Sequence, residues 1–80
     1  MQVLFFARLR EELNTPGIVI NEAVNNVGQL REILQKKGPR WQSLLDSEQS
    51  LVAVNQTLAD DTQVLKSGDE VAFFPPVTGG

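Results

Sequence analysis

Short apolar runs along the chain predict four strands and one main helix. Residues 2–7 (QVLFFA) and 17–21 (GIVIN) are rich in β-forming side chains and too short for buried helices, so each predicts a strand. Residues 8–13 between them carry leucines four positions apart, which suits a short helical turn. Residues 51–55 and 70–74 predict two more strands, and residues 56–58 either continue the former past a bend or form a short edge strand.

The main helix is predicted to begin after Asn26, whose side chain suits an N-cap with Gln29 as its capping-box partner. Two lysines at positions 36 and 37 then fall in the last turn, where cations complement the helix dipole. Gly38 as the C′ residue and Pro39 just beyond it are expected to end the helix. The apolar face of this helix consists of Val27, Leu30, Ile33 and Leu34.

The order of these elements predicts an α+β fold. The first two strands can pair as an antiparallel hairpin, and a right-handed crossover through the helix then brings the later strands beside the first. The expected product is a mixed sheet of four or five strands packed on one main helix. A short turn over residues 40–46 is expected to add Trp41 as a lid on the core.

Alternation along the strands predicts an exposed pair of aromatic rings, because successive side chains point to opposite faces of a sheet. If Val3, Phe5 and Ala7 face the helix, Phe6 points to the open face. By the same rule Phe74 points to the open face from the last strand. Two rings on adjacent strands form a patch typical of a surface that binds another protein, unless a loop covers them.

Composition excludes most catalytic chemistry for this chain. It has 80 residues with no cysteine and no histidine, which removes thiolate nucleophiles, imidazole acid–base catalysis and zinc sites. A net charge of −3 disfavours nucleic-acid binding, because phosphate contacts need clustered lysine and arginine. The longest apolar run, residues 3–7, is too short for a bilayer span or a signal peptide, so we expect a cytoplasmic protein that does not contact membranes.

The last six residues, PPVTGG, carry the clearest functional pattern. The two prolines stiffen the exit from the final strand, and Val77 and Thr78 offer side chains that a partner can grip. Gly79 and Gly80 have no Cβ, so they fit a narrow channel and can present a carboxylate there for activation. We predict a folded domain over residues 1–76 and a flexible functional tail over residues 77–80, with passive fraying of the tail as the alternative.

Three blocks of the sequence stand out together: VLFFAR at residues 3–8, VNQ at residues 54–56 and GDEVAFFPPVTGG at residues 68–80. They closely resemble the small, sulfur-carrying subunit of molybdopterin synthase. That family has the ubiquitin-like β-grasp fold, so the resemblance implies this fold for residues 1–76. The resemblance covers the whole chain, and its C-terminal block is the most specific part.

The resemblance implies a sulfur-transfer cycle on Gly80 for a subunit that is not catalytic alone. An adenylyltransferase similar to ubiquitin-activating enzymes would use ATP and magnesium to adenylate the carboxylate, while this chain alone would bind no cofactor and no metal. Sulfur would then replace AMP and leave a thiocarboxylate. The sulfur would pass to cyclic pyranopterin monophosphate in the large catalytic subunit, within a heterotetramer where two small subunits flank a dimer of the large one.

The resemblance also implies roles for individual positions. Gly80 would carry the acyl group, and Val77, Thr78 and Gly79 would enter the partner's active site. The candidates for docking on the large subunit are Phe6, Arg10, Leu58 and Phe74. Of these, Leu58 depends on where the third strand bends.

Other functions stay open at this stage. A sulfur carrier for thiamine synthesis or tRNA thiolation would share the Gly-Gly end and the fold. A ubiquitin-like modifier would link Gly80 to lysines of other proteins, and a purely structural binding domain would use the aromatic face alone. A hydrolase built on Asp60-Asp61 or Asp69-Glu70 is disfavoured, because neighbouring acids in loops are usually solvated and strand neighbours point apart.

Overall fold

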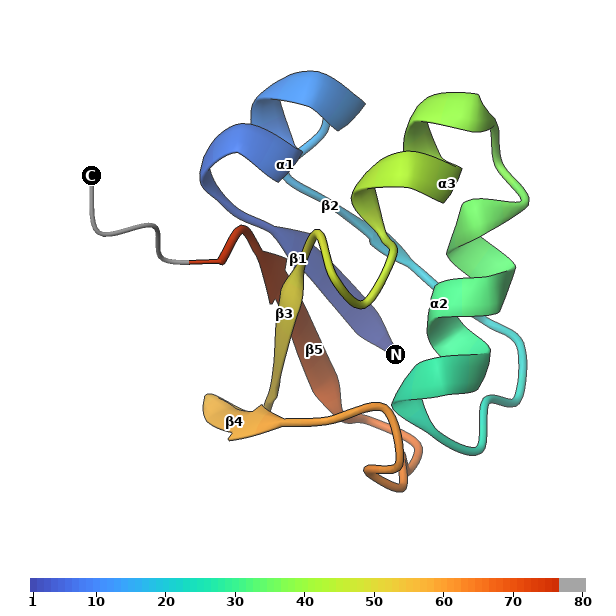
Figure 1. Ribbon diagram of the computed structural model, residues 1–80. Helices are drawn as coiled ribbons and strands as arrows, with labels where there is room; N and C mark the ends of the chain where they lie inside the picture. The colour runs from blue at the N-terminus through green and yellow to red at the C-terminus, as the bar shows by residue number, and fades with distance from the viewer. Residues whose placement is uncertain (77–80) are drawn as a thin grey trace.

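The structure is a computed structural model that describes residues 1–76 of the chain. Within these residues, five strands form one mixed sheet and three helices pack around it (Figure 1). The strands are β1 (Gln2–Phe5), β2 (Gly17–Val19), β3 (Leu51–Val54), β4 (Thr57–Ala59) and β5 (Glu70–Phe74). The helices are α1 (Ala7–Leu13), α2 (Val27–Gln35) and α3 (Pro39–Leu44). The predicted α+β class is confirmed.

The sheet has the strand order β2-β1-β5-β3-β4, so the last strand lies at its centre beside the first. β1 pairs with β2 as the predicted antiparallel hairpin and with β5 in parallel, while β3 is antiparallel to both β5 and β4. The predicted crossover is therefore confirmed, since β5 returns beside β1 and runs in the same direction. This topology brings the chain after Phe74 to the same end of the sheet as the end of β1.

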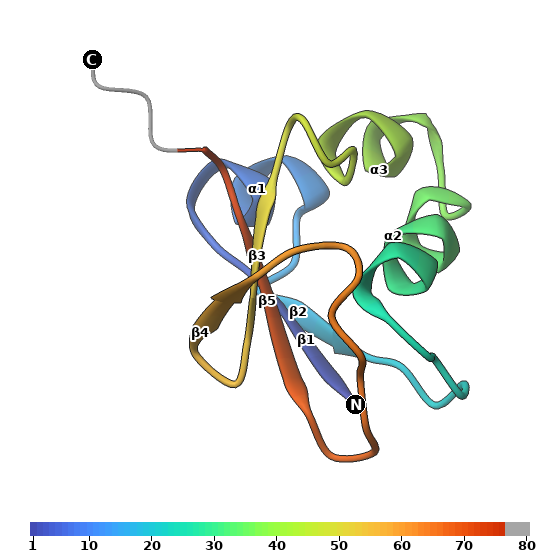
Figure 2. The same ribbon diagram turned by 60° about the horizontal axis from the view of Figure 1, so that its bottom comes forward.

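Helices α2 and α3 cover one face of the sheet and leave the other face open (Figures 1 and 2). Val3 and Phe5 of β1, and Val71 and Phe73 of β5, point into the core and are at most 1% exposed. The predicted alternation is confirmed for these positions. It is wrong for Ala7, which is exposed and begins α1, because β1 ends at Phe5.

Aromatic rings fill the core where β1, β5 and α3 meet. The ring of Phe5 lies edge-on to that of Trp41, with centroids 5.4 Å apart, and stacks near that of Phe73 at 6.3 Å. Trp41 is half-buried at the margin of the core, which confirms its predicted place as a lid.

The N-terminus of α2 follows the prediction and its C-terminus does not. The Asn26 side chain accepts a hydrogen bond from the backbone N–H of Gln29 at 2.8 Å, while the Gln29 side chain accepts from the N–H of Asn25. The helix ends at Gln35, so the two lysines follow it and do not lie in its last turn. Gly38 has an extended φ of 162°, so it is not the left-handed C′ residue that was predicted to end α2. The reason is that Pro39 opens α3, where proline is favoured, and a residue before proline is held extended.

Two other strands end earlier than predicted. The strand expected over residues 17–21 stops at Val19, and that expected over residues 51–55 stops at Val54. Asn55 and Gln56 have φ values of 50° and 69° and form a two-residue hairpin turn, after which β4 follows as an edge strand. The edge-strand alternative for residues 56–58 is thus confirmed.

A buried arginine connects the helical layer to the sheet. Arg31 of α2 is 5% exposed and donates hydrogen bonds to the carbonyl oxygens of Leu45 and Ser50 and to the Ser50 hydroxyl, at 2.7–2.9 Å. Its Nε donates to the Asp61 carboxylate at 2.7 Å, and its guanidinium lies 5.1 Å from the centroid of the Phe73 ring. Arg31 therefore holds together the start of β3, the loop after β4 and the centre of β5.

Candidate functional site

The open face of the sheet carries a continuous row of small and aliphatic residues. Strand pairing places Leu4 of β1 opposite Ala72 of β5, Ala72 opposite Ala53 of β3, and Ala53 opposite Leu58 of β4. Because directly paired residues point to the same face, all four side chains belong to one row. Leu58 is 68% exposed, so this row ends in a large apolar side chain that the described chain leaves uncovered.

The aromatic residues lie at the end of the sheet where β1 and β5 finish. Phe6 follows Phe5, and Phe74 follows Phe73, in two parallel strands whose Phe5 and Phe73 are register partners. Phe6 is 46% exposed and Phe74 is half-buried, and Leu51 of β3 pairs with Phe74. The open apolar face is our name for the surface formed by the row of Leu4, Ala72, Ala53 and Leu58 together with Phe6, Phe74 and Leu51.

Packing in the core fixes the direction of both aromatic residues. Phe5 and Phe73 stack on the covered face, so the residues that follow them in extended backbone point to the opposite face. The Phe6 N–H donates to the Phe73 carbonyl at 3.1 Å, which continues the β1–β5 ladder by one residue. The alternative in which a loop covers both rings fails for Phe6, which stays about half exposed.

Arg10 lies on α1, at the end of the sheet where β5 finishes (Figure 1). Its residue is exposed, and no hydrogen bond or ion pair to its guanidinium occurs within residues 1–76. By contrast, Arg8 on the same helix pairs with Glu12 at 3.3 Å. Arg10 stays a candidate for docking, as predicted.

The last strand leads to the two prolines that end the described residues. β5 ends at Phe74, as predicted, and Pro75 and Pro76 follow it outside the ladder, because proline cannot donate a backbone hydrogen bond. Val77, Thr78, Gly79 and Gly80 lie outside the described residues. The roles predicted for them, and the predicted boundary at residue 76, stay predictions.

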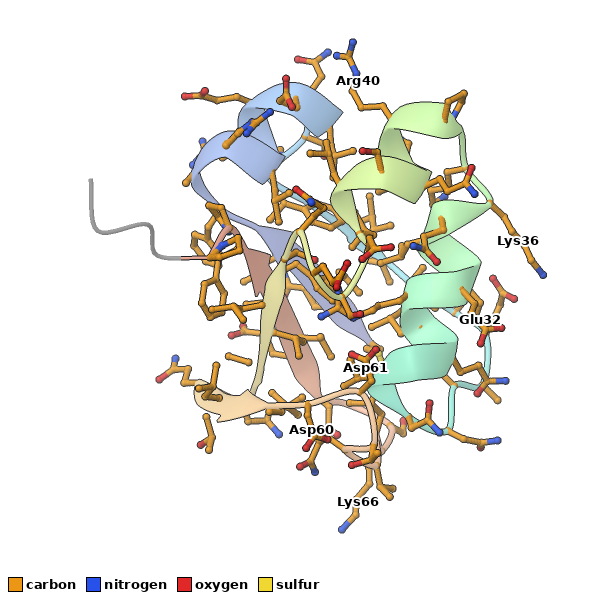
Figure 3. The ribbon with its side chains drawn as sticks, in the orientation of Figure 1. Glu32, Lys36, Arg40, Asp60, Asp61 and Lys66 are labelled. Atoms are coloured by element: carbon orange, nitrogen blue, oxygen red, sulfur yellow. The ribbon has the colours of Figure 1, made fainter. Side chains whose placement is uncertain are left out.

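The acidic residues proposed for a hydrolase serve the fold in the described part of the chain. Asp61 points at α2 and binds Arg31 (Figure 3). The side chain of Thr62 donates to Asp60, and this hydrogen bond holds the pKa of Asp60 below its usual value. Asp69 likewise has a lowered pKa, chiefly because the Asn55 amide donates to it at 3.0 Å. No group of three metal-ligating residues occurs within residues 1–76.

Sequence reasoning missed three residues that shape this site. Leu51 lies beside Phe74 only because β3 and β5 pair in one particular register, which no local pattern reveals. Arg31 resembled a solvated helix residue, and only its place four positions after Val27, on the apolar face, indicated burial. Ala7 gave no local indication of its left-handed backbone.

A five-stranded mixed sheet with one helix-covered face and one open apolar face defines a ubiquitin-like β-grasp protein, as predicted. The chain belongs to the ThiS family, whose sequence profile matches residues 3–80. It is 44% identical over 80 residues to the molybdopterin synthase sulfur carrier subunit of Haemophilus influenzae. The alignment covers 100% of this chain and 99% of that protein. The predicted family resemblance is confirmed.

Two solved structures extend the similarity. SAMP1 from Haloferax volcanii matches with a TM-score of 0.81 and 27% identity, covering 99% of this chain and 97% of that one. A chain of the complex of subunits 1 and 2 of molybdopterin-converting factor from Helicobacter pylori matches with a TM-score of 0.70 and 29% identity, covering 99% and 96%. No helix within residues 1–76 is long and apolar enough to cross a membrane.

Proposed function

We propose that this chain is the sulfur-carrying small subunit of a molybdopterin synthase, with Gly80 as the carrier of the sulfur. The observation that carries the proposal is the 44% identity to a sulfur carrier subunit along the whole chain, including both ends. The open apolar face supports it, because its aromatic residues, Phe6 and Phe74, lie at the end of the sheet where β5 finishes and the chain continues toward Gly80.

The proposed cycle begins with activation of the Gly80 carboxylate by a separate adenylyltransferase. The carboxylate attacks the α-phosphate of magnesium-bound ATP and releases pyrophosphate, and the acyl carbon then bears AMP as a good leaving group. A persulfide displaces AMP, and a thiol cleaves the sulfur–sulfur bond to leave the thiocarboxylate and a disulfide. Gly79 and Gly80 carry no side chain, so neither residue itself crowds the reacting carbon.

The second half of the cycle takes place in the large synthase subunit. The open apolar face docks on that subunit while residues 77–80 enter its active site, and the thiocarboxylate sulfur passes to cyclic pyranopterin monophosphate. Two transfers build one dithiolene. In each, the sulfur bonds to the pterin and water attacks the acyl carbon of Gly80, so that its carbon–sulfur bond breaks and the carboxylate returns. Two small subunits on a dimer of the large one bring one sulfur to each large subunit per docking, so one dithiolene needs two dockings. The acid–base residues of this reaction belong to the partner.

The transfer step is tested by intact mass spectrometry of the chain after incubation with its activating enzyme, ATP, magnesium and a persulfide donor. We expect the mass to rise by the difference between sulfur and oxygen. A variant with one bulky residue added after Gly80 serves as the control and should keep the unmodified mass. Full sulfur transfer to the pterin from that extended variant would contradict the proposal.

The docking step is tested with Phe74→Arg and the matched variant Gln42→Arg. Both add one positive charge, but Gln42 is an exposed residue of α3, on the helical side of the molecule. Burying a phenylalanine ring contributes about 1.5–3 kcal/mol, so Phe74→Arg should raise the Kd for the large subunit by roughly 10- to 100-fold. Gln42→Arg should leave the Kd unchanged. A folded Phe74→Arg protein that binds normally would show that docking uses another surface.

A second function is favoured by one observation. Small archaeal modifier protein 1 of Haloferax volcanii matches this chain at a TM-score of 0.77 and 26% identity, so the same fold is compatible with attachment of Gly80 to protein lysines. Conjugates of the chain with other proteins in cell extracts would support this modifier function.

A sulfur carrier for thiamine synthesis or tRNA thiolation is distinguished from a molybdopterin carrier by which pathway product disappears in a deletion strain.

A further inference from the structure

The junction between β1 and α1 contains a strained alanine. Ala7 has a backbone φ of 53°, in the left-handed region that the Cβ of an L residue disfavours. The other non-glycine residues with positive φ in the described chain are Asn14, Asn55 and Gln56, which all have polar side chains. Alanine has no polar group to offset the strain, so the surrounding structure holds it in this conformation.

Hydrogen bonds on both sides show what the strained residue joins. Before it, the Phe6 N–H donates to the Phe73 carbonyl of β5 at 3.1 Å. After it, the N–H of Leu9 in α1 donates back to the Phe6 carbonyl at 3.1 Å, and the Leu9 side chain is fully buried. Ala7 is therefore the point at which the chain turns from the end of the sheet into α1.

The turn fixes the backbone that follows Phe6, whose direction from the sheet is already set by β1. Phe6 is the first residue of the chain after β1 and is 46% exposed beside the strand that carries Phe74. With a negative φ at Ala7, the chain beyond Phe6 would leave the sheet in another direction. Phe6 is held by backbone hydrogen bonds on both sides, because its N–H donates to β5 and its carbonyl accepts from α1.

We propose that the left-handed conformation of Ala7 makes it a positioning residue for docking, acting through the ring of Phe6. This inference rests on the proposed function, in which the open apolar face binds the large synthase subunit. Holding the ring ready before binding raises affinity, because the apparent Kd is the intrinsic Kd divided by the competent fraction. A purely structural role for Ala7 would instead affect only the packing of α1.

Two substitutions perturb the junction in different ways. Ala7→Val puts a β-branched residue where φ is positive, which favours other junction conformations and should raise the Kd for the large subunit by about tenfold. Ala7→Gly removes the strain but admits more backbone conformations, so the Kd should rise by roughly two- to threefold while stability is kept or raised. The matched controls are Asn14→Val and Asn14→Gly, at the left-handed residue that follows the last turn of α1. These should change stability and leave the Kd unaltered.

The decisive measurement is a double-mutant cycle with Phe6→Ala. We measure the Kd of each variant for the cognate large subunit by titration calorimetry, after circular dichroism has shown that each variant is folded. If Ala7 acts through Phe6, both Ala7 substitutions lose their effect on the Kd in the Phe6→Ala background. Equal effects on the Kd in both backgrounds would overturn the inference. It would also be overturned if Ala7→Gly leaves the Kd unchanged while Ala7→Val either leaves the Kd unchanged or does not fold.

Failure of the proposed function would look different. If the unmodified chain does not bind the large subunit, the proposed function is refuted, and this inference is refuted with it. If the unmodified chain binds and Phe74→Arg weakens binding, while the Ala7 variants behave like their Asn14 controls, only the positioning role of Ala7 is refuted.

Discussion

Replacement of the buried arginine tests what holds the helical layer on the sheet. Arg31→Met keeps a long side chain of similar reach but removes all the donors of the guanidinium. The carbonyl oxygens of Leu45 and Ser50 then lose the hydrogen bonds that they accept at 2.9 Å. Leu45 and Ser50 are both fully buried, so water cannot replace the lost donors without opening the structure.

The expected loss follows from counting these acceptors. Each buried carbonyl left without a donor costs about 1–3 kcal/mol, and two are affected. The Ser50 hydroxyl is spared, because it still donates to the Asp46 carbonyl at 3.2 Å. The apolar methionine offsets part of the loss by removing the desolvation of a buried charge. We expect Arg31→Met to lower the free energy of unfolding by about 3 kcal/mol, near the low end of what breaking a buried pair costs.

Urea titration followed by circular dichroism measures this loss. For a domain of this size, with an m-value of roughly 1 kcal/mol/M, the midpoint should fall by about 3 M. Asp61→Asn is the matched control, because it removes the charge partner but not the buried bonds, and the Asp61 side chain is 40% exposed. It should cost about 1 kcal/mol or less. If Arg31→Met costs no more than Asp61→Asn, the ion pair and not the buried carbonyl bonds would be the important contact.

Three other substitutions test local features of the fold. Gly17→Ala should destabilise by about 1–3 kcal/mol in urea titration, because its Cβ would lie 2.6 Å from the backbone oxygen of Val3; an unchanged midpoint would contradict this. Gln56→Gly should stabilise by about 0.5 kcal/mol, since relief of the left-handed strain exceeds the added entropy of glycine; a lower midpoint would show that the turn is not strained. The lowered pKa of Asp69 means that it contributes stability above the unfolded value of 3.8, and that this contribution is lost as the pH falls from 3.8 through the folded value. Asp69→Asn should therefore flatten the acid limb of the stability curve, and an unchanged limb would exclude this contribution.

The strands could be predicted from sequence because each is a short apolar run between turn residues. Glu70–Phe74 was predicted to the residue, since Gly68 before it and two prolines after it permit no other limits. The end of α2 could not be predicted, because Pro39 opens a new helix and takes Gly38 out of the role of a cap. Local rules allow Gly38 either to cap α2 or to precede the first residue of α3, and the packing of α3 on the core decides between these two roles.

The candidate site was predictable as far as strand alternation reaches. Phe6 and Phe74 follow from the period of two, whereas Leu58 required the hairpin turn at residues 55–56 to be known. The hydrogen-bond partners of Arg31 were not predictable, because they lie 14, 19 and 30 positions away in the sequence. Contacts at such separations depend on the topology, which no local pattern contains.

The two faces of the sheet separate the stability of this protein from its recognition of a partner. Phe73 is buried under Arg31 and next to Phe5, so changes there alter folding first. Phe74, one residue later, faces the other side, where the proposed docking surface lies, so we expect changes there to alter binding first. Because β5 carries both residues and leads directly to Pro75, the core fixes the position at which the proposed tail begins. In the proposed cycle, docking through Phe74 would set that position relative to the partner, so that only the last residues would need to find the active site.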